Sequence, residues 1–338
     1  MASPSARPPT PAPASRPSTR PWMPTALGTW PAPRTAPPGE PRRRPARPAR
    51  QRTLATPTPD PPAPTPTTTP PPLLGPLGPL APGQVLIESS CQADTYDALA
   101  ARAVALAEAD PGGRVVIALA GGPGSGKSTA AAGVASRVSS ALPPLPGAPS
   151  GAASAVFLPM DGFHYTRAQL DAGVAGDPPA AHARRGAPWT FDAAAFAAAV
   201  AAAAVPGTAL DAPSFDHGAG DPAPGGAAIR PWHRVVIVEG NYVLCENGAW
   251  AGVAQVATEK WFLGCPLKVA MKRVTARQRR QGRPAGVVAR RIAQNDRPNA
   301  VLVNRCVGRA DVVARTDLPA GKGSGGKGER VEDEEDEG

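Results

Sequence analysis

The feature that most constrains the fold of this chain is a glycine-rich loop between two segments of different pattern. Residues 121–129 read GGPGSGKST and fit the pattern G-x-x-x-x-G-K-[ST] at every position. Residues 114–120 form the apolar, β-branched run expected of a parallel strand buried on both faces, and residues 128–140 contain good helix formers without proline. The order of strand, loop and helix favours a phosphate-binding loop over a chance match in a Gly-rich chain.

Each residue type in this loop has a physical task. Glycine permits backbone conformations closed to other residues, so that successive N–H groups can face an anion at the positive end of the helix dipole. Lys127 is predicted to reach the β- and γ-phosphates of a nucleotide, and the Ser128 hydroxyl is predicted to bind Mg²⁺. The predicted nucleotide-binding residues are Gly121, Gly122, Gly124, Ser125, Gly126, Lys127, Ser128 and Thr129.

The ends of the chain differ in composition from its middle. Residues 1–85 are rich in Pro, Ala, Arg, Thr and Ser and lack the apolar content of a core, so we expect a disordered extension. Its basic, acid-poor character resembles a plastid or mitochondrial transit peptide; the alternative is a low-complexity extension, or a mispredicted start, of a cytoplasmic protein. Residues 86–318 are the predicted folded domain, and residues 319–338 are a predicted disordered acidic tail.

Charge is distributed unevenly along the chain. The net charge is +9, but residues 1–85 carry +8 and residues 329–338 carry −6, which leaves +7 for the part between them. A moderately basic domain suits a polyanionic nucleotide and does not by itself indicate nucleic-acid binding. The chain has no run of 18 apolar residues, so we expect no membrane span. Its four cysteines form no C-x-x-C pair and are predicted to be buried thiols.

Two further apolar runs, residues 155–159 and 233–238, are predicted strands that each lead to an acid. Ligands of open α/β sheets bind at the carboxyl ends of the strands, so Asp161 and Glu239 should lie beside the glycine loop. Asp161 is the candidate catalytic base, with a simple Asp-Gly turn as the alternative. Glu239 fits the Walker B arrangement, whose carboxylate holds Mg²⁺ directly or through water.

Three short polar motifs supply candidate acceptor-site residues. One follows Asp161, the second contains a pair of arginines, and the third is PSFDH at residues 213–217, on a loop or short hairpin before a Gly/Pro loop. Paired arginines can clamp a phosphate or carboxylate or stay solvated, and an Asp-His pair can bind a polyhydroxy substrate or form an Asx turn. The candidate acceptor-binding residues are His164, Tyr165, Arg184, Arg185, Asp216 and His217.

A basic helix is predicted over residues 267–282. Most of its cations should lie on a solvated face, but one or two arginines could close over the γ-phosphate as a lid, with Arg273 and Arg277 as candidates. Other predicted helices cover residues 95–108, 193–204 and 287–295, and other predicted strands cover residues 259–263 and 310–314.

The order of six motifs resembles the uridine kinase, phosphoribulokinase and pantothenate kinase superfamily, and particularly its uridine kinase-like branch. The motifs are GGPGSGKST at 121–129, MDGFHY at 160–165, RGAPWTFD at 185–192, PSFDH at 213–217, VIVEGNY at 236–242 and NDRPN at 295–299. The resemblance implies an α/β P-loop NTPase fold, a doubly wound parallel sheet with helices on both faces and a helical lid. It also implies ATP and Mg²⁺ as cofactors and a hydroxyl of a sugar, nucleoside or related small metabolite as the phosphoryl acceptor.

The same resemblance implies that Asp161 is the catalytic acid, Glu239 the carboxylate on the magnesium side, and the arginines of residues 273–283 the lid. The sequence around Asp216 and His217 departs from the nucleoside-binding pattern of uridine kinases.

Two other classes of function compete with a kinase. A P-loop GTPase or switch would carry an N-K-x-D motif for guanine, and the sequence contains none. Binding of a nucleic acid or partner through the Arg-rich extension leaves Lys127, Asp161 and Glu239 without a role. We therefore do not expect nucleic-acid binding by the folded domain.

Overall fold

The computed structural model describes residues 80–216 and 219–318 of the chain. The predicted extension up to residue 79, the predicted tail from residue 319, and His217 lie outside the described residues. The packed structure begins before the predicted boundary at residue 86, because Val85 starts the first strand. The side-chain amide of Gln84 also donates hydrogen bonds to the carbonyls of Val307 (2.8 Å) and Ala310 (2.7 Å).

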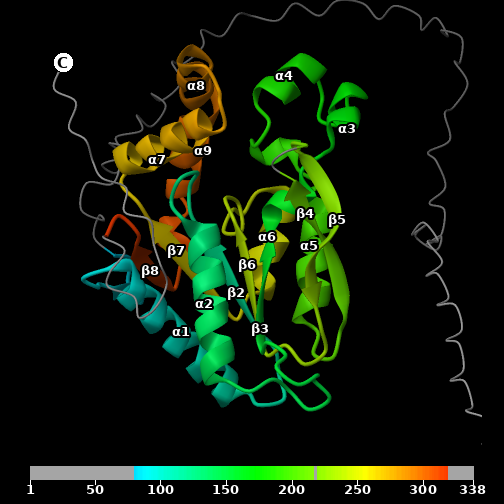
Figure 1. Cartoon of the computed structure of the whole chain (residues 1–338), viewed down its shortest axis with the longest axis vertical. Helices are drawn as coiled ribbons and strands as arrows, with labels where there is room; N and C mark the ends of the chain where they lie inside the picture. Colours follow the sequence, from blue (N-terminus) through cyan, green and yellow to red (C-terminus); the bar gives the residue numbers. More distant parts are fainter. Residues whose placement is uncertain (1–79, 217–218, 319–338) are drawn as a thin grey trace, which may run out of the picture. The chain divides into compact units, whose positions relative to one another are not determined.

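A six-stranded parallel sheet forms the centre of the described part, with the strand order β1-β8-β7-β2-β6-β3 (Figure 1). Its strands are β1 (Val85–Ile87), β2 (Val115–Ala120), β3 (Ala155–Pro159), β6 (Val235–Gly240), β7 (Glu259–Gly264) and β8 (Val312–Arg315). The strand predicted before the glycine loop is β2, at an inner position of the sheet. Its neighbours β6 and β7 pair with it over residues 235–240 and 259–262.

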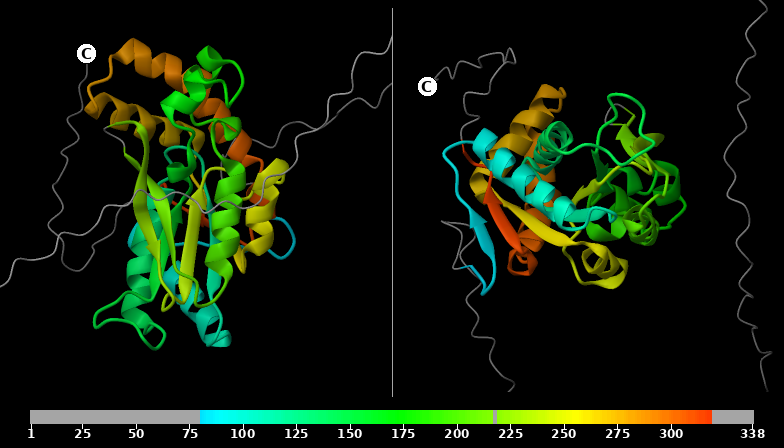
Figure 2. Two further views of the ribbon diagram at one scale, coloured as in Figure 1. Left: turned by 90° about the vertical axis from the view of Figure 1, so that its right-hand side faces the viewer. Right: turned by 90° about the horizontal axis from the view of Figure 1, so that it is seen from below.

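The α-helices are α1 (Gln92–Ala109), α2 (Lys127–Ala141), α3 (Arg167–Asp171), α4 (Pro178–Ala183), α5 (Ala193–Ala204), α6 (Ala251–Val256), α7 (Leu267–Arg280), α8 (Ala285–Arg291) and α9 (Arg297–Asn304). A π-helical turn, η4 (Ile292–Asp296), joins α8 to α9, and short 3₁₀ turns include η1 (Met160–Phe163) and η2 (Pro188–Thr190). In Figure 1 and in the left view of Figure 2, α7 and α8 lie beyond the same end of the sheet as α3 and α4.

Alternate residues of β2 serve two separate hydrophobic cores. Val115, Ile117 and Leu119 face α1 and α2, whereas Val116 and Ala118 belong to the core that includes α5 and α6. Figure 2 shows helices on either side of the sheet. A strand covered on both faces has no solvated side, which is why its sequence is continuously apolar. The prediction of a doubly wound α/β sheet is confirmed.

The segment that follows α5 folds as an antiparallel hairpin of β4 (Leu210–Asp216) and β5 (Asp221–Ile229). The prediction of a Gly/Pro loop after residue 217 is wrong, since residues 221–229 form a strand that contains Pro222. Proline is tolerated because each strand of a two-stranded sheet has one edge without a ladder partner. The pairing register shifts between Ala212 and Ser214, on either side of Pro213.

Two observations on the described residues bear on the predicted chemistry. None of their helices combines the length and apolar character needed to cross a membrane. The four cysteines are free thiols; Cys245, Cys265 and Cys306 are buried as predicted, whereas Cys91 is half-buried.

The buried His233 gives the fold a pH dependence that can be measured. Its Nδ1 accepts a hydrogen bond from the Arg230 backbone N–H (3.0 Å), and burial, with the charges of Arg114 and Arg230, lowers its pKa from 6.5 to about 4. The native state therefore holds His233 neutral, and this stabilisation is complete above pH 6.5 and decreases as the pH falls towards 4. The loss amounts to about 3 kcal/mol at most.

We expect His233→Gln to reduce the difference in unfolding free energy between pH 7.5 and pH 4.5, measured by urea denaturation. His182→Gln, which changes a half-buried histidine that pairs with Asp171 (2.7 Å), is the comparison variant. Equal pH dependence in the wild type and His233→Gln would contradict the assignment.

Candidate active site

The glycine loop is shaped by two residues in the left-handed backbone region. Gly124 has φ +80° and Gly126 has φ +84°, where side chains are rarely accommodated. A Cβ on Gly124 would also lie 2.2 Å from the carbonyl oxygen of Ala270 on α7. The following helix begins at Lys127, so its free N–H groups face the loop. The geometry is that of an anion cradle.

An acid, a hydroxyl and an ammonium group meet at the ends of β6 and the loop. The Glu239 carboxylate is buried, and its Oε1 accepts a hydrogen bond from the Ser128 hydroxyl (3.0 Å). Burial raises the pKa of Glu239 to about 7; Lys127 opposes this shift, and the charge of Asp161 adds to it. These mutual effects place Lys127, Ser128, Asp161 and Glu239 in one site, as their sequence positions predicted.

This group of oxygens fits Mg²⁺. The second oxygen of Glu239, Oε2, is buried without a hydrogen-bond partner in the described structure. Burial of an unpartnered carboxylate oxygen is costly unless a ligand satisfies it. Among the described residues, no three His, Cys, Asp or Glu side chains converge as a metal-binding group. Mg²⁺ is usually held by few protein ligands together with water and phosphate oxygens, and the Ser128 hydroxyl and Glu239 carboxylate are ligands of this kind.

His164 and Tyr165 help to build the wall that follows Asp161. The His164 ring packs between Phe191 (3.9 Å between ring centroids) and Phe215 (4.7 Å). Its Nδ1 lies 2.8 Å from the Asp161 carbonyl oxygen, and burial is the main cause that lowers its pKa. His164 is therefore neutral and packed, so its geometry supports the turn that carries Asp161. Tyr165 is half-buried beside it.

Arg185 is engaged by the protein itself. Its guanidinium pairs with Asp221 (2.7 Å), donates to the carbonyls of Tyr165 (2.8 Å) and Gly220, and lies over the Phe215 ring. It thus connects the hairpin to the Asp161 turn, and its Nε is buried without a hydrogen-bond partner in the described structure. This role was missed because its partner Asp221 lies in the segment expected to be a loop.

Two other predicted site residues take local structural roles. Asp216 is exposed at the hairpin turn, where its Oδ1 accepts a hydrogen bond from the Ala219 N–H (3.1 Å), the Asx-type alternative. Arg273 donates from Nη2 to the carbonyl of Thr316 (2.7 Å), and Thr316 in turn donates to the Ser125 carbonyl (2.6 Å). Arg273 therefore stabilises the loop indirectly, through Thr316. Arg277 is exposed on α7.

Arg184 is held by two asparagines that residue patterns alone did not single out. Its Nε donates to Asn295 Oδ1 (3.3 Å) and its Nη2 to Asn299 Oδ1 (3.4 Å). The π-helical turn η4 buries Asn295, and α9 carries Asn299 one turn later. The only sequence signal was their presence in the NDRPN motif.

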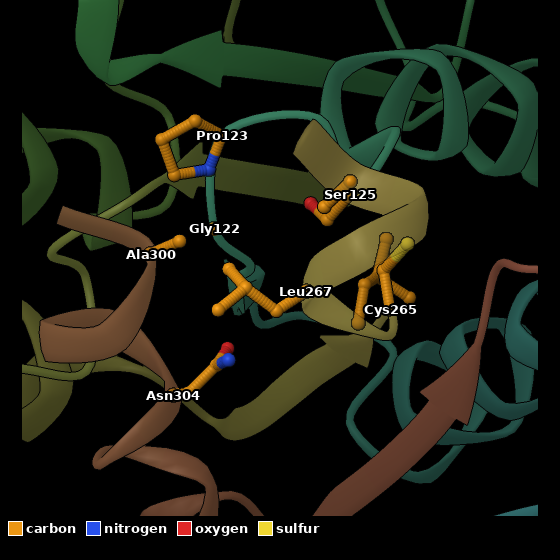
Figure 3. A pocket seen from close by; sticks show the side chains of 9 residues that line it. Gly122, Pro123, Ser125, Cys265, Leu267, Ala300 and Asn304 are labelled. Carbon is orange, nitrogen blue, oxygen red and sulfur yellow. The ribbon is translucent and has the colours of Figure 1, made fainter. Parts of the chain in front are cut away.

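Helix α9 also packs against the glycine loop. Figure 3 shows a small pocket between the loop, α7 and α9, whose lining includes Gly122, Leu267 and Ala300. A Cβ on Gly122 would lie 3.4 Å from the Ala300 Cα atom, which shows how closely α9 approaches the loop. The loop, α9 and Arg184 therefore form one continuous assembly.

The fold is that of a P-loop kinase. It has a parallel sheet, a glycine loop after the inner strand β2, a lysine at the start of the following helix and an acid near the end of the neighbouring strand β6. A Schizosaccharomyces pombe protein described as "Putative uridine kinase" is 36% identical over 222 residues, which are 65% of this chain and 89% of that protein. A solved structure described as a "putative fructose transport system kinase" from Silicibacter is 31% identical, with TM-score 0.52, over 64% of this chain and 98% of that one.

The YFH7 structure from Saccharomyces cerevisiae, described as "a putative P-loop containing kinase with a circular permutation", is 21% identical with TM-score 0.55, over 66% of this chain and 99% of that one. This last similarity concerns the fold alone. No family model matches the chain. The chain belongs to the uridine kinase-like family of P-loop kinases, which favours a kinase over a GTPase or switch.

Proposed function

We propose that the protein transfers the γ-phosphoryl group of ATP to a hydroxyl of a small sugar, nucleoside or related metabolite, with Mg²⁺ as cofactor. The observation that carries this proposal is the meeting of Lys127, Ser128, Asp161 and Glu239 at the end of the glycine loop. Phosphoryl transfer requires mainly positioning and neutralisation of charge, and this group contains the means for both.

Each residue has a distinct task in this proposal. The loop N–H groups bind the phosphates and Lys127 neutralises the transferring group. Ser128 and Glu239 would hold Mg²⁺, which supplies further neutralisation of phosphate charge when bound. Asp161 orients the acceptor hydroxyl and accepts its proton. The half-buried Tyr165 and Arg184 are candidates for contact with the acceptor.

The proposal is tested by a screen of small hydroxyl metabolites for ADP release from ATP, with the full chain. ADP release that depends on one class of acceptor, and that is absent from a Lys127→Ala preparation, would support it. ATP consumption that no acceptor increases would contradict it and would indicate an NTPase.

A further inference from the structure

We propose that Arg184 binds an oxyanion of the phosphoryl acceptor, a carboxylate or a phosphate, and that Asn295 and Asn299 position it for this task. This inference rests on the proposed function and narrows its acceptor to anionic hydroxyl compounds. It combines three observations: how Arg184 is held, which charges surround it, and where it lies.

The two asparagines hold Arg184 by oxygen atoms whose orientation is determined by the main chain. Asn295 Nδ2 donates to the carbonyl of Arg185 (2.9 Å), and Asn299 Nδ2 donates to the carbonyl of Gly186 (3.1 Å). A carbonyl oxygen can only accept, so the amino group of each amide must face the chain and the oxygen must face Arg184. The guanidinium is therefore oriented by two neutral groups, which do not neutralise its positive charge.

The surrounding charges leave Arg184 without a counterion. Arg185 pairs with Asp221 (2.7 Å), and Arg291 has Asp296 at 3.9 Å. No carboxylate lies within 4.0 Å of the Arg184 guanidinium in residues 80–216 and 219–318. A half-buried cation without a counterion is costly unless a ligand supplies the negative charge. A guanidinium with free donors suits the planar oxygens of a carboxylate or the oxygens of a phosphate.

The neighbours of Arg184 connect it to the end of β6 and to the glycine loop. The Gly186 carbonyl also accepts a hydrogen bond from the Tyr242 hydroxyl (2.6 Å), three residues after Glu239. Ala300, next to Asn299, packs on Gly122 of the glycine loop. Arg184 therefore lies between the end of β6 and the loop, on the segment that leads to the wall of His164 and Phe191.

The oxyanion could belong to either of two ligands, the acceptor or the γ-phosphate of ATP. We assign it to the acceptor because Arg184 comes from the α4–η2 segment beside the Asp161 turn, whereas the proposed function assigns Lys127 to the nucleotide phosphates. The experiment below separates the two sources.

The test compares matched acceptors, such as glycerate with glycerol, erythronate with erythritol, and sugar phosphates with their free sugars. We expect ADP release with anionic members and little with neutral ones. Arg184→Gln should raise KM for the anionic acceptor by about tenfold to hundredfold, the usual range for a charge-assisted hydrogen bond, and Arg184→Lys by less. The affinity for a fluorescent ATP analogue should stay within about twofold. Arg305→Gln, an exposed arginine after α9, is the matched control.

A double-mutant cycle tests the positioning role. Asn299→Ala should raise KM for the anionic acceptor in the wild type but have little further effect in Arg184→Gln. Equal effects in both backgrounds would show that Asn299 stabilises the fold without acting through Arg184.

Three outcomes would overturn the inference. If neutral acceptors are phosphorylated as well as anionic ones, the inference is refuted, whereas the proposed kinase function is not. Weaker binding of the ATP analogue to Arg184→Gln, with unchanged acceptor preference, would assign the oxyanion to the γ-phosphate. ADP release that no acceptor increases would refute the proposed function, and this inference with it.

Discussion

Lys127→Ala is expected to lower turnover by about 10²–10³-fold, the usual cost of removing one preorganised charge from a transferring group. The change should leave the fold intact, because the glycine loop is shaped by Gly124 and Gly126 and by its packing on α7 and α9. Turnover is measured by ADP release with the best acceptor of the screen, and folding by melting temperature.

Lys260→Ala is the matched control. Lys260 lies on β7, pairs with Asp311 (3.3 Å) and has no part in the proposed site. That variant should keep wild-type turnover. A Lys127→Ala enzyme with near wild-type turnover would overturn the assignment of the loop.

Asp161→Asn is expected to lower turnover by about 10²-fold or more while ATP affinity changes by a few-fold at most. Asparagine keeps the shape and some hydrogen bonding but cannot accept the proton of the acceptor hydroxyl. Loss of Glu239 should differ, because its effect should appear chiefly as a changed Mg²⁺ requirement. The measurement is turnover and ATP affinity of Asp161→Asn across a titration of Mg²⁺.

Asp97→Asn provides the control, as Asp97 is an exposed acid on α1 that pairs with Arg137. It should be neutral in turnover. If high Mg²⁺ restored turnover to Asp161→Asn, Asp161 would belong to the metal side, and the division of tasks between the two acids would be wrong.

Local sequence patterns were sufficient for the sheet core and for the position of the loop. β2 and β6 are buried along their whole length and β3 is partly buried, so residues 115–120, 235–238 and 155–159 are apolar and the ends of these runs are easily recognised. The rule that ligands lie at the carboxyl ends of parallel strands then brought Asp161 and Glu239 to the loop. These features depend on residues close together in the sequence.

The hairpin and the edge strand β1 could not be recognised in this way. Pro222 argues against a central strand, and only the pairing with β4 shows that an edge strand accommodates it. β1 is three residues long and pairs with β8, more than 200 residues later, so its own sequence carries little signal. Both depend on partners that the sequence order does not indicate.

The sequence by itself determined the phosphate loop, the two acids and the class of fold, because each is encoded by a short run of residues. Only the tertiary structure decided which partners each of the paired arginines has. Arg184 and Arg185 are adjacent and chemically identical, yet one is neutralised by Asp221 and the other is held by two neutral amides over 100 residues away. The charge that each presents depends on its partners in space, and no local pattern specifies those partners.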